Sequence, residues 1–432
     1  MEWMEVIVLV LTFGALIALG VPISFCIGLA TIATMLLTIQ TTPALTTVAQ
    51  RMATGLDSFA LLAIPFFILS GQLMNRGGIA RRLIEFAKVM VGMFPGGLAF
   101  VNILAAMFFG SISGSAAAAA SAIGGFMTPL MDKEGYDRGF SAAVNISSST
   151  TGLLIPPSNI LIVYSLASGG VSIGALFLAG YLPGMVVGLS LMAVAAAISI
   201  SRKYPVGKAS NLGEAFKKFL DAIPSLLLII IVMGGIIAGY FTATEASAIA
   251  VLYTFILSVV IYREVKLKEL PKVCLDTAST TAIVMLLIGT SMGMSWILAY
   301  TNIPQSVSAA LIALTDNKIL ILLIINLILL FVGAFMDMTP AVLIFTPIFL
   351  PVAVSLGIDP IHFGIIMVMN LCIGLCTPPV GSILFIGVGI ANTTIAKVLR
   401  PLFPMFVAMF LALMAVTYIP EISMALPRLF GY

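Results

Sequence analysis

Charged side chains are scarce in this sequence. Asp, Glu, Lys and Arg make up only 9% of its residues and hydrophobic residues 61%, whereas soluble domains contain about 25% charged residues. This scarcity excludes a soluble globular domain. The basic residues stand in short connections between apolar runs, so no nucleic acid is expected as a partner. Runs at residues 6–19, 226–239 and 319–332 are about as long as a lipid bilayer requires. The sequence therefore predicts an all-α polytopic membrane protein.

Residues that carry enzyme chemistry are also few. The chain has one histidine, His362, and four cysteines without C-x-x-C spacing. It contains no HExxH motif, no GxSxG followed by a membrane histidine, and no acidic pair deep in an apolar run, so we expect no enzyme. The cysteines are expected to pack as small hydrophobes, and His362 to act as a cap or at an interface rather than in a proton relay. Residues 1–5 lack the positive n-region of a secretory signal, so the first apolar run is expected to stay in the mature protein.

Hydropathy divides residues 1–200 into spans, a hairpin and a broken helix. Two short apolar arms at 95–131 meet at GSISGS, residues 110–115. This pattern favours a re-entrant hairpin over two full crossings, because unwound backbone at membrane depth must be buried in protein or line a cavity. A helix at 139–167 is interrupted at SSSTTGLLIPPSN, residues 147–159. The other elements expected here are scaffold helices within 1–92, namely 4–20, 22–40, 58–75 and a basic amphipathic stretch at 76–92, and a helix at 171–200.

Residues 222–432 repeat this order after a basic cytoplasmic linker at 201–221. Gly152 and Gly374 are 222 residues apart, as are the pairs Pro156-Pro157 and Pro378-Pro379. Two structural repeats are therefore expected. The elements of the second are scaffold helices within 222–299 at 222–240, 243–262 and 274–299, a short segment at 303–315, a hairpin at 318–352 around GAFMDMTP, a broken helix at 360–391 and a helix at 396–418.

The number of crossings decides how the repeats are related. Each repeat crosses five times if its hairpin does not span and seven times if it does, so the repeats are expected to have inverted topology. With both termini periplasmic, 17 of the 20 Lys and Arg residues, Lys208 among them, fall on the cytoplasmic side, and only Arg51, Lys318 and Arg428 fall outside. This distribution follows the positive-inside rule. Inverted repeats with paired broken helices indicate a substrate site near the bilayer midplane.

The two hairpin tips and two helix breaks are polar clusters deep within apolar sequence. Their hydroxyl and carbonyl oxygens, together with the negative C-terminal ends of half-helices, suit a hard cation such as sodium. The alternative is that small residues merely allow close helix packing, and their occurrence at corresponding places in both repeats argues against it. The residues expected at the two cation sites are Gly110, Ser111, Gly152 and Ile155 in the first repeat, and Gly333, Gly374, Thr377 and Val380 in the second.

An organic acid requires positive potential, yet no Lys or Arg lies deep within a predicted span. Restarting helices can supply this potential through free N–H groups at four places: Gly114 to Ala117, Ser158-Asn159, Thr339 and Gly381-Ser382. Asp337 is the one acidic residue at a hairpin tip. It is expected to couple ions or to bind substrate hydroxyls, and capping of the tip is the structural alternative.

Four stretches resemble a known family: PFFILSGQLMNRGGIARRL (65–83), FGSISGSAAA from Phe109, GLLIPPSN (152–159) and GLCTPPVGSILF (374–385). They resemble the large membrane (M, DctM-like) permease subunit of tripartite ATP-independent periplasmic (TRAP) transporters, within the wider group of inverted-repeat elevator-type transporters. The resemblance covers nearly the full length.

This resemblance implies sodium symport, with two or more Na+ ions, of a small carboxylate such as sialic acid or a C4-dicarboxylate across the bacterial inner membrane. It implies substrate contacts around Ser113, Ser115 and Asp337, beside the helix starts at Ser158 and Asn159. The partners would be a periplasmic substrate-binding protein and a small four-helix membrane subunit, expected as a separate chain. A passive anion channel and a binding-protein-independent carboxylate carrier stay open as alternatives, and the substrate itself does not follow from the sequence.

Overall fold

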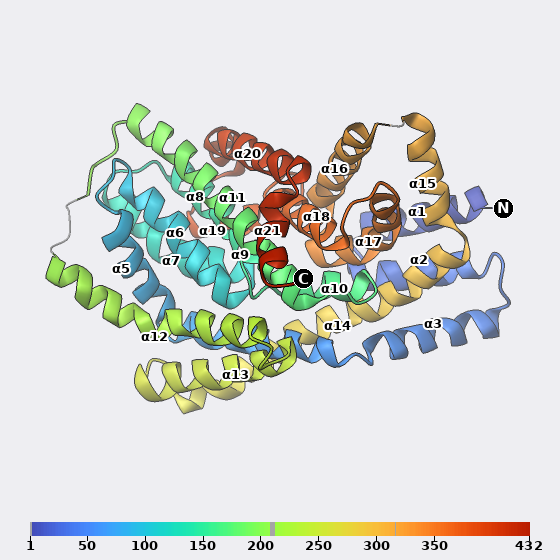
Figure 1. Cartoon of the computed structure of the whole chain (residues 1–432), viewed down its shortest axis with the longest axis horizontal. Helices are drawn as coiled ribbons and strands as arrows, with labels where there is room; N and C mark the ends of the chain where they lie inside the picture. Colours follow the sequence, from blue (N-terminus) through green and yellow to red (C-terminus); the bar gives the residue numbers. More distant parts are fainter. Residues whose placement is uncertain (1, 208–211, 316) are drawn as a thin grey trace.

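The computed structural model describes residues 2–207, 212–315 and 317–432 (Figure 1). Within these ranges the chain is helical, and its only β-type pairing is an isolated bridge between Pro95 and Val206. Eight helices of the described part are long and apolar enough to cross a membrane, or nine if the bent helix at 138–167 counts as one span. The predicted class of all-α polytopic membrane protein is confirmed.

The first half follows the predicted order of spans, hairpin and broken helix. The break in its interrupted helix bends the chain by 51° between residues 154 and 159, where two prolines interrupt the helical hydrogen bonds. The elements are α1 (Glu2–Ala18), α2 (Ile23–Met35), α3 (Thr41–Leu56), η1 (Phe59–Leu62), α4 (Ala63–Arg76), α5 (Ile79–Val91), α6 (Gly97–Ser113), α7 (Ala116–Lys133), α8 (Arg138–Ser149), α9 (Thr151–Leu154), α10 (Asn159–Ala167) and α11 (Ile173–Ser201).

The second half repeats this order, and its break separates α18 from α19. The elements are α12 (Leu212–Ile237), α13 (Ala243–Phe255), the π-helical turn η2 (Ile256–Ile261), η3 (Leu267–Glu269), α14 (Leu270–Tyr300), α15 (Ile303–Leu314), α16 (Lys318–Phe335), α17 (Met338–Ser355), α18 (Pro360–Gly374), α19 (Ser382–Ile390), α20 (Ile395–Tyr418) and α21 (Glu421–Leu429).

Three elements differ from the sequence-based prediction. Helix α3 was not expected because its sequence, TTPALTTVAQRMATGL, is too polar for a span, but Ala44 and Val48 are buried in a core shared with α14. Helix α21 was also missed. Helix α12 begins at Leu212, inside the predicted linker, where Phe219 packs on Phe86 and Lys218 pairs with Glu85. Residues 208–211 of that linker, including Lys208, lie outside the described residues.

The two hairpins and the two broken helices interlock. The first half of each broken helix packs on its own hairpin: α8 on α6 and α7, and α18 on α16 and α17. The second half crosses to the other hairpin, so α10 packs on α17 and α19 on α7. The hairpins lie on opposite sides of the broken helices in Figure 1. We call α6–α10 together with α16–α19 the interlocked body.

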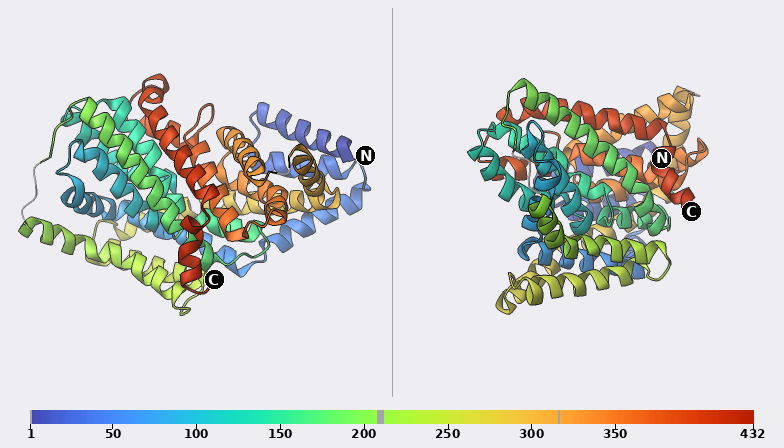
Figure 2. Two further views of the ribbon diagram at one scale, coloured as in Figure 1. Left: turned by 45° about the horizontal axis from the view of Figure 1, so that its top comes forward. Right: turned by 60° about the vertical axis from the view of Figure 1, so that its left-hand side comes forward.

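The helices α1–α5 and α12–α15 form a frame beside this body. Helix α14 packs on α2, α3 and α4, while α4 packs on α13 and α5 on α12. The right-hand view in Figure 2 shows α12 and α13 side by side along one edge of the molecule. Helices α4, α5, α14 and α15 also pack on members of the interlocked body, so these four helices form the wall between frame and body.

Contacts between segments far apart in the sequence divide the helix ends into two groups. Ion pairs join the first group, at segments where the charge pattern predicts the cytoplasmic side: Arg76 with Asp276, Arg81 and Arg82 with Glu264, Lys218 with Glu85, and Arg202 with Asp137. Hydrogen bonds to backbone carbonyls join the second group, at segments predicted outside: Thr244 to Phe59 (3.0 Å), Tyr164 to Pro360 (2.7 Å) and Tyr418 to Ile319 (2.9 Å).

Candidate functional site

The first hairpin tip lies directly against the first helix break. Helix α6 ends at Gly114, which has a φ of +59°, and Ser115 starts α7 by accepting a hydrogen bond from the Ala118 N–H at 3.3 Å. A Cβ atom on Gly114 would lie 2.9 Å from the carbonyl oxygen of Pro157. Only glycine combines this left-handed φ with so close an approach of two backbones.

A glycine contact joins each hairpin to its broken helix. A Cβ on Gly110 would overlap the Cα of Gly152, and a Cβ on Gly374 would lie 2.6 Å from the Cα of Gly333. All four glycines are buried. The structure therefore brings the predicted cation-site glycines together in two pairs, one in each repeat.

These contacts lie where helices end. Helices α6 and α9 end within four residues of Gly110 and Gly152, and α16 and α18 end within two residues of Gly333 and Gly374. Helix C-termini present unpaired carbonyl groups and about half of a negative charge each. Each contact thus places two such ends side by side, in surroundings suited to a cation.

The hydroxyl groups at these contacts have lone pairs to spare. Ser111 donates its proton to the Phe108 carbonyl and Thr377 to the Ile373 carbonyl, both at 2.8 Å. Because a hydroxyl oxygen that donates can still accept or ligate, both oxygens keep acceptor capacity. The N–H of Val380 donates to the Ala334 carbonyl at 3.2 Å, which ties the second break to the second tip. Ile155 lies in the first break and is buried.

The second tip differs from the first in its cap. Asp337 occupies the N-cap position of α17, but its side chain does not make the capping hydrogen bond that Ser115 makes at the first tip. Its Oδ1 atom lies 3.5 Å from the Ser382 hydroxyl at the start of α19. The carboxylate is exposed to a cavity between the body and the frame.

This cavity has a volume of about 550 Å³ and brings together four of the five predicted substrate residues: Ser113, Ser115, Asn159 and Asp337. Ser158 does not line it, because its side chain is fully buried and donates to the Leu153 carbonyl at 2.6 Å. The sequence analysis missed the polar residues that α4 and α14 contribute. The missed polar lining residues are Gln72, Asn75, Ser121 and Thr280, whereas Thr339 and Ser382, which also line the cavity, were expected there as starts of restarting helices.

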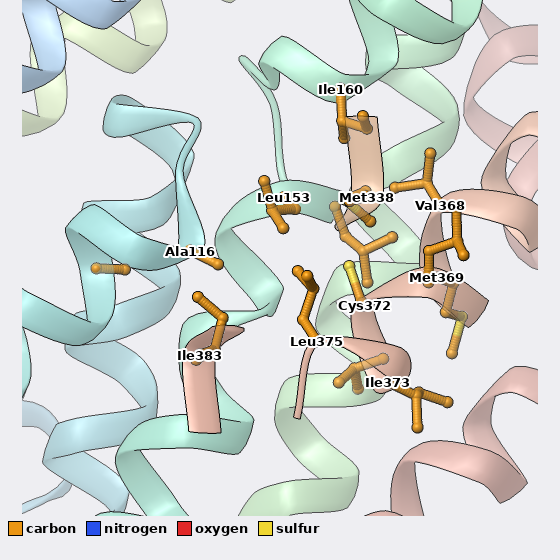
Figure 3. Packing of buried hydrophobic residues seen from close by; sticks show 14 of the residues in the cluster. Ala116, Leu153, Ile160, Met338, Val368, Met369, Cys372, Ile373, Leu375 and Ile383 are labelled. Atoms are coloured by element: carbon orange, nitrogen blue, oxygen red, sulfur yellow. The ribbon is translucent and has the colours of Figure 1, made fainter. Parts of the chain in front are cut away.

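Four helices begin at the wall of the cavity. Figure 3 shows Ala116, Ile160, Met338 and Ile383, each the first or second residue of α7, α10, α17 or α19, gathered around one point with Leu153 and Leu375. All six residues line the cavity. Free N–H groups at helix starts attract anions. Among the described residues that line the cavity, Asp337 is the one charged side chain.

The side chain of His362 does not cap α18. Asp359 caps α18 by accepting from the Ile361 N–H at 2.8 Å. The imidazole is buried instead, with Nδ1 2.6 Å from the Ser423 hydroxyl and Nε2 3.4 Å from the Thr417 carbonyl. A capping role for His362 is therefore wrong, and the contact with Ser423 was not foreseen because the sequence did not predict α21.

Comparison with known proteins places this architecture in a family. Residues 10–422 match the family described as "Tripartite ATP-independent periplasmic transporter, DctM component". The uncharacterized protein YgiK of Salmonella typhimurium is 55% identical, with 99% of this chain and 98% of YgiK covered. The C4-dicarboxylate TRAP transporter large permease protein DctM of Rhodobacter capsulatus is 38% identical (97% and 98% covered), and the sialic acid large permease protein SiaM of Vibrio cholerae 37% (96% of each).

A solved structure shares the fold. The YdaH transporter of Alcanivorax borkumensis superposes with a TM-score of 0.63 at 15% identity, and 89% of each chain is covered. The relatives named above as permeases are transporter subunits, so this chain is a transporter subunit and not an enzyme. Its apolar helices and its relatives make it a multi-pass inner-membrane protein. The chain belongs to the DctM-component family of tripartite ATP-independent periplasmic transporters.

Proposed function

We propose that this chain couples the entry of sodium to the uptake of a small carboxylate across the bacterial inner membrane. One observation carries the proposal: helix C-termini meet in pairs at the two glycine contacts, whereas four helix N-termini converge on the cavity. The first arrangement attracts cations and the second attracts anions. A symporter requires both kinds of site in one body, so that cation and substrate stabilise the same conformation.

The residues present fit two sodium ions. Oxygen atoms are the ligands that hard cations prefer, and each glycine contact gathers backbone carbonyls with one hydroxyl, that of Ser111 or of Thr377. The first ion would be held by Gly110, Ser111, Gly152 and Ile155, and the second by Gly333, Gly374, Thr377 and Val380. The sodium gradient would then supply the free energy for accumulating the substrate.

The partners and substrates of relatives extend the proposal. The family description is tripartite, and we infer a periplasmic substrate-binding protein and a separate small four-helix membrane subunit as the other two components. Relatives are named for C4-dicarboxylate and sialic acid. A small carboxylate of this range is therefore the proposed substrate, delivered by the binding protein to the cavity lined by Ser115, Asn159 and Asp337.

We infer that the interlocked body moves as an elevator against the frame. The two groups of helix ends support inverted repeats with periplasmic termini. The first hairpin begins and ends beside the ion-paired group of helix ends, next to residues 202–206. The second hairpin begins at the group joined by hydrogen bonds, where Tyr418 contacts Ile319. The exchange of α10 and α19 between the hairpins supports motion of the body as one unit. One tip moving alone would expose unpaired backbone to lipid.

Reconstituted uptake tests the proposed function. The full chain is placed in liposomes with its membrane partner, and a loaded binding protein is added outside. An inward sodium gradient should then drive accumulation of the carboxylate above its outside concentration, and an equal potassium gradient should not. A passive anion channel would give flux without accumulation, and a binding-protein-independent carrier would not need the binding protein. Either result would replace the proposal.

Crosslinking tests the elevator motion. A Cβ on Gly71 of α4 would lie 3.3 Å from the carbonyl oxygen of Ser113 at the first tip, so Gly71→Cys with Ser113→Cys should crosslink in this arrangement. In the opposite state Ser113 should reach Ile64, seven residues or ~10.5 Å along α4. The control pair Ile146→Cys with Gly387→Cys lies within the body and should crosslink equally in both states. Equal crosslinking of Gly71 with Ser113 in both states would favour rocking around a fixed site.

A further inference from the structure

The residues that line the cavity form a row along one face of α4 and another along one face of α14. The row on α4 ends with Gln72 and Asn75, and the row on α14 ends with Thr280. The next position on each face, four residues further, is Arg76 on α4 and Asp276 on α14. These two residues therefore stand one helical turn beyond the cavity lining, near the ends of α4 and α14 that the charge pattern predicts to be cytoplasmic.

Arg76 and Asp276 form an ion pair that joins the two helices. The Nη2 atom of Arg76 lies 2.5 Å from the Oδ2 atom of Asp276, and 30% and 39% of their side-chain surfaces are exposed. Within the described part of the chain, Nη2 is the one guanidinium nitrogen that donates a hydrogen bond. Because a guanidinium carries five N–H donors, Arg76 keeps donors for a second acceptor. The pair is thus open to water and able to bind another anion.

Arg76 is the first basic side chain that an anion meets when it leaves the cavity along these two faces. The described residues that line the cavity include no Lys, Arg or His. Arginine holds a carboxylate through two parallel N–H···O bonds. A partly exposed ion pair contributes little stability, so a substrate carboxylate can compete with Asp276 at small cost. Asp276 competes in return, and this limits how long Arg76 retains the substrate.

We propose that Arg76 receives the substrate carboxylate on its way from the cavity to the cytoplasm, and that Asp276 then displaces the substrate from Arg76. We call this the exit role of the pair. Lys272 is exposed one turn beyond Asp276 on α14 and supplies the next positive charge on the same face. The inference rests on the proposed function, because it takes a carboxylate as the transported substrate.

Inhibition of uptake by substrate on the cytoplasmic side tests the exit role. Liposomes that contain the full chain and its membrane partner are preloaded with unlabelled succinate or sialic acid. Sodium-driven uptake of the same labelled carboxylate is then measured with a binding protein for it outside, which selects chains whose periplasmic side faces out. The internal concentration that halves uptake reports how strongly the exit retains the anion.

The two members of the pair should change this concentration in opposite directions. Arg76→Gln removes the receiving cation and should raise the concentration about fivefold. Asp276→Asn frees the guanidinium to retain the anion and should lower the concentration about fivefold. Arg76→Lys keeps the charge without the two-bond geometry, so it should fall between Arg76→Gln and the wild type.

These opposite signs separate the exit role from a structural one. Arg76→Gln and Asp276→Asn break the same ion pair, so a merely structural pair would make both variants change alike. Arg138→Gln and Asp132→Asn break an exposed pair elsewhere in the chain and should leave the inhibitory concentration unchanged.

Changes of the same sign in Arg76→Gln and Asp276→Asn, or wild-type values in both, would overturn the exit role. Sodium-driven uptake by the wild type in that experiment would leave the proposed function standing. A wild type that accumulates neither carboxylate would remove the proposed function and the exit role together.

Discussion

Replacing Gly374 by alanine tests the contact that joins the second hairpin to the second broken helix. The new Cβ would lie 2.6 Å from the Cα of Gly333 and 2.8 Å from its carbonyl oxygen. Ordinary contacts of a Cβ begin at 3.4 Å, so the two backbones must separate by about 0.8 Å, the difference between 3.4 and 2.6 Å. Binding sites tolerate displacements of about 0.5 Å. We therefore expect the proposed cation site to lose its geometry.

The size of the effect follows from the cost of overpacking. Extra atoms in a tightly packed contact cost about 1–3 kcal/mol, and each 1.4 kcal/mol changes an affinity about tenfold. If this cost falls on the sodium-bound state, the sodium concentration for half-maximal uptake should rise about tenfold. Gly333→Ala places its Cβ 3.1 Å from Gly374 and requires a separation of only about 0.3 Å, so its effect should be smaller.

Sodium-dependent uptake into liposomes measures this series. Gly389→Ala in α19 is the matched control, because a Cβ there has no atom within 4 Å, and it should keep the wild-type sodium dependence. The expected order of half-maximal sodium concentrations is Gly374→Ala above Gly333→Ala above Gly389→Ala. If Gly374→Ala responds to sodium as Gly389→Ala does, the glycine contact does not shape a cation site.

Three further predictions concern other parts of the same body. Thr377→Val removes a hydroxyl oxygen and should raise the sodium requirement, with Thr377→Ser close to wild type; an unchanged requirement would remove this side chain from the site. Gly152→Ala places a Cβ 2.5 Å from the Gly110 Cα, so it should raise the sodium concentration for half-maximal uptake at least as much as Gly374→Ala does. A wild-type sodium requirement in Gly152→Ala would limit cation binding to the second repeat. Asn326→Leu leaves the Asn370 amide, which now donates to Asn326 at 2.8 Å, without its side-chain acceptor and should lower unfolding stability by about 1–3 kcal/mol. Asn102→Leu should not lower the unfolding stability, because both amide atoms of Asn102 are buried without a partner in the described structure. Equal losses of unfolding free energy in the two variants, measured by calorimetry, would contradict this distinction.

Local signals predicted much of this fold. The span predicted at 274–299 is α14 (Leu270–Tyr300), because a long apolar run specifies a helix without reference to the rest of the chain. The break at 147–159 is found between α9 and α10 for the same reason, since two adjacent prolines interrupt a helix wherever they occur. Helix α3 was missed because its burial depends on α14, which lies more than 200 residues later in the sequence.

The candidate site could be predicted only in part. Glycine, serine and proline at corresponding places of two repeats indicated the tips and breaks, and the structure brings Gly110 to Gly152 and Gly333 to Gly374. Gln72 and Asn75 carried no such signal. They face the cavity because the first tip packs beside Gly71 of α4, a contact between helices that no local pattern in α4 specifies.

The exchange of α10 and α19 between the two hairpins has a consequence for biogenesis. A ribosome that has completed the first half of the chain has released α7 and α10, but their packing partners α19 and α17 are not yet made. The apolar faces of the first hairpin must therefore stay in contact with lipid or with the insertion machinery until α19 follows. A nascent chain released after α11 would carry several membrane spans and no cavity, and would be a substrate for quality control rather than half of a transporter.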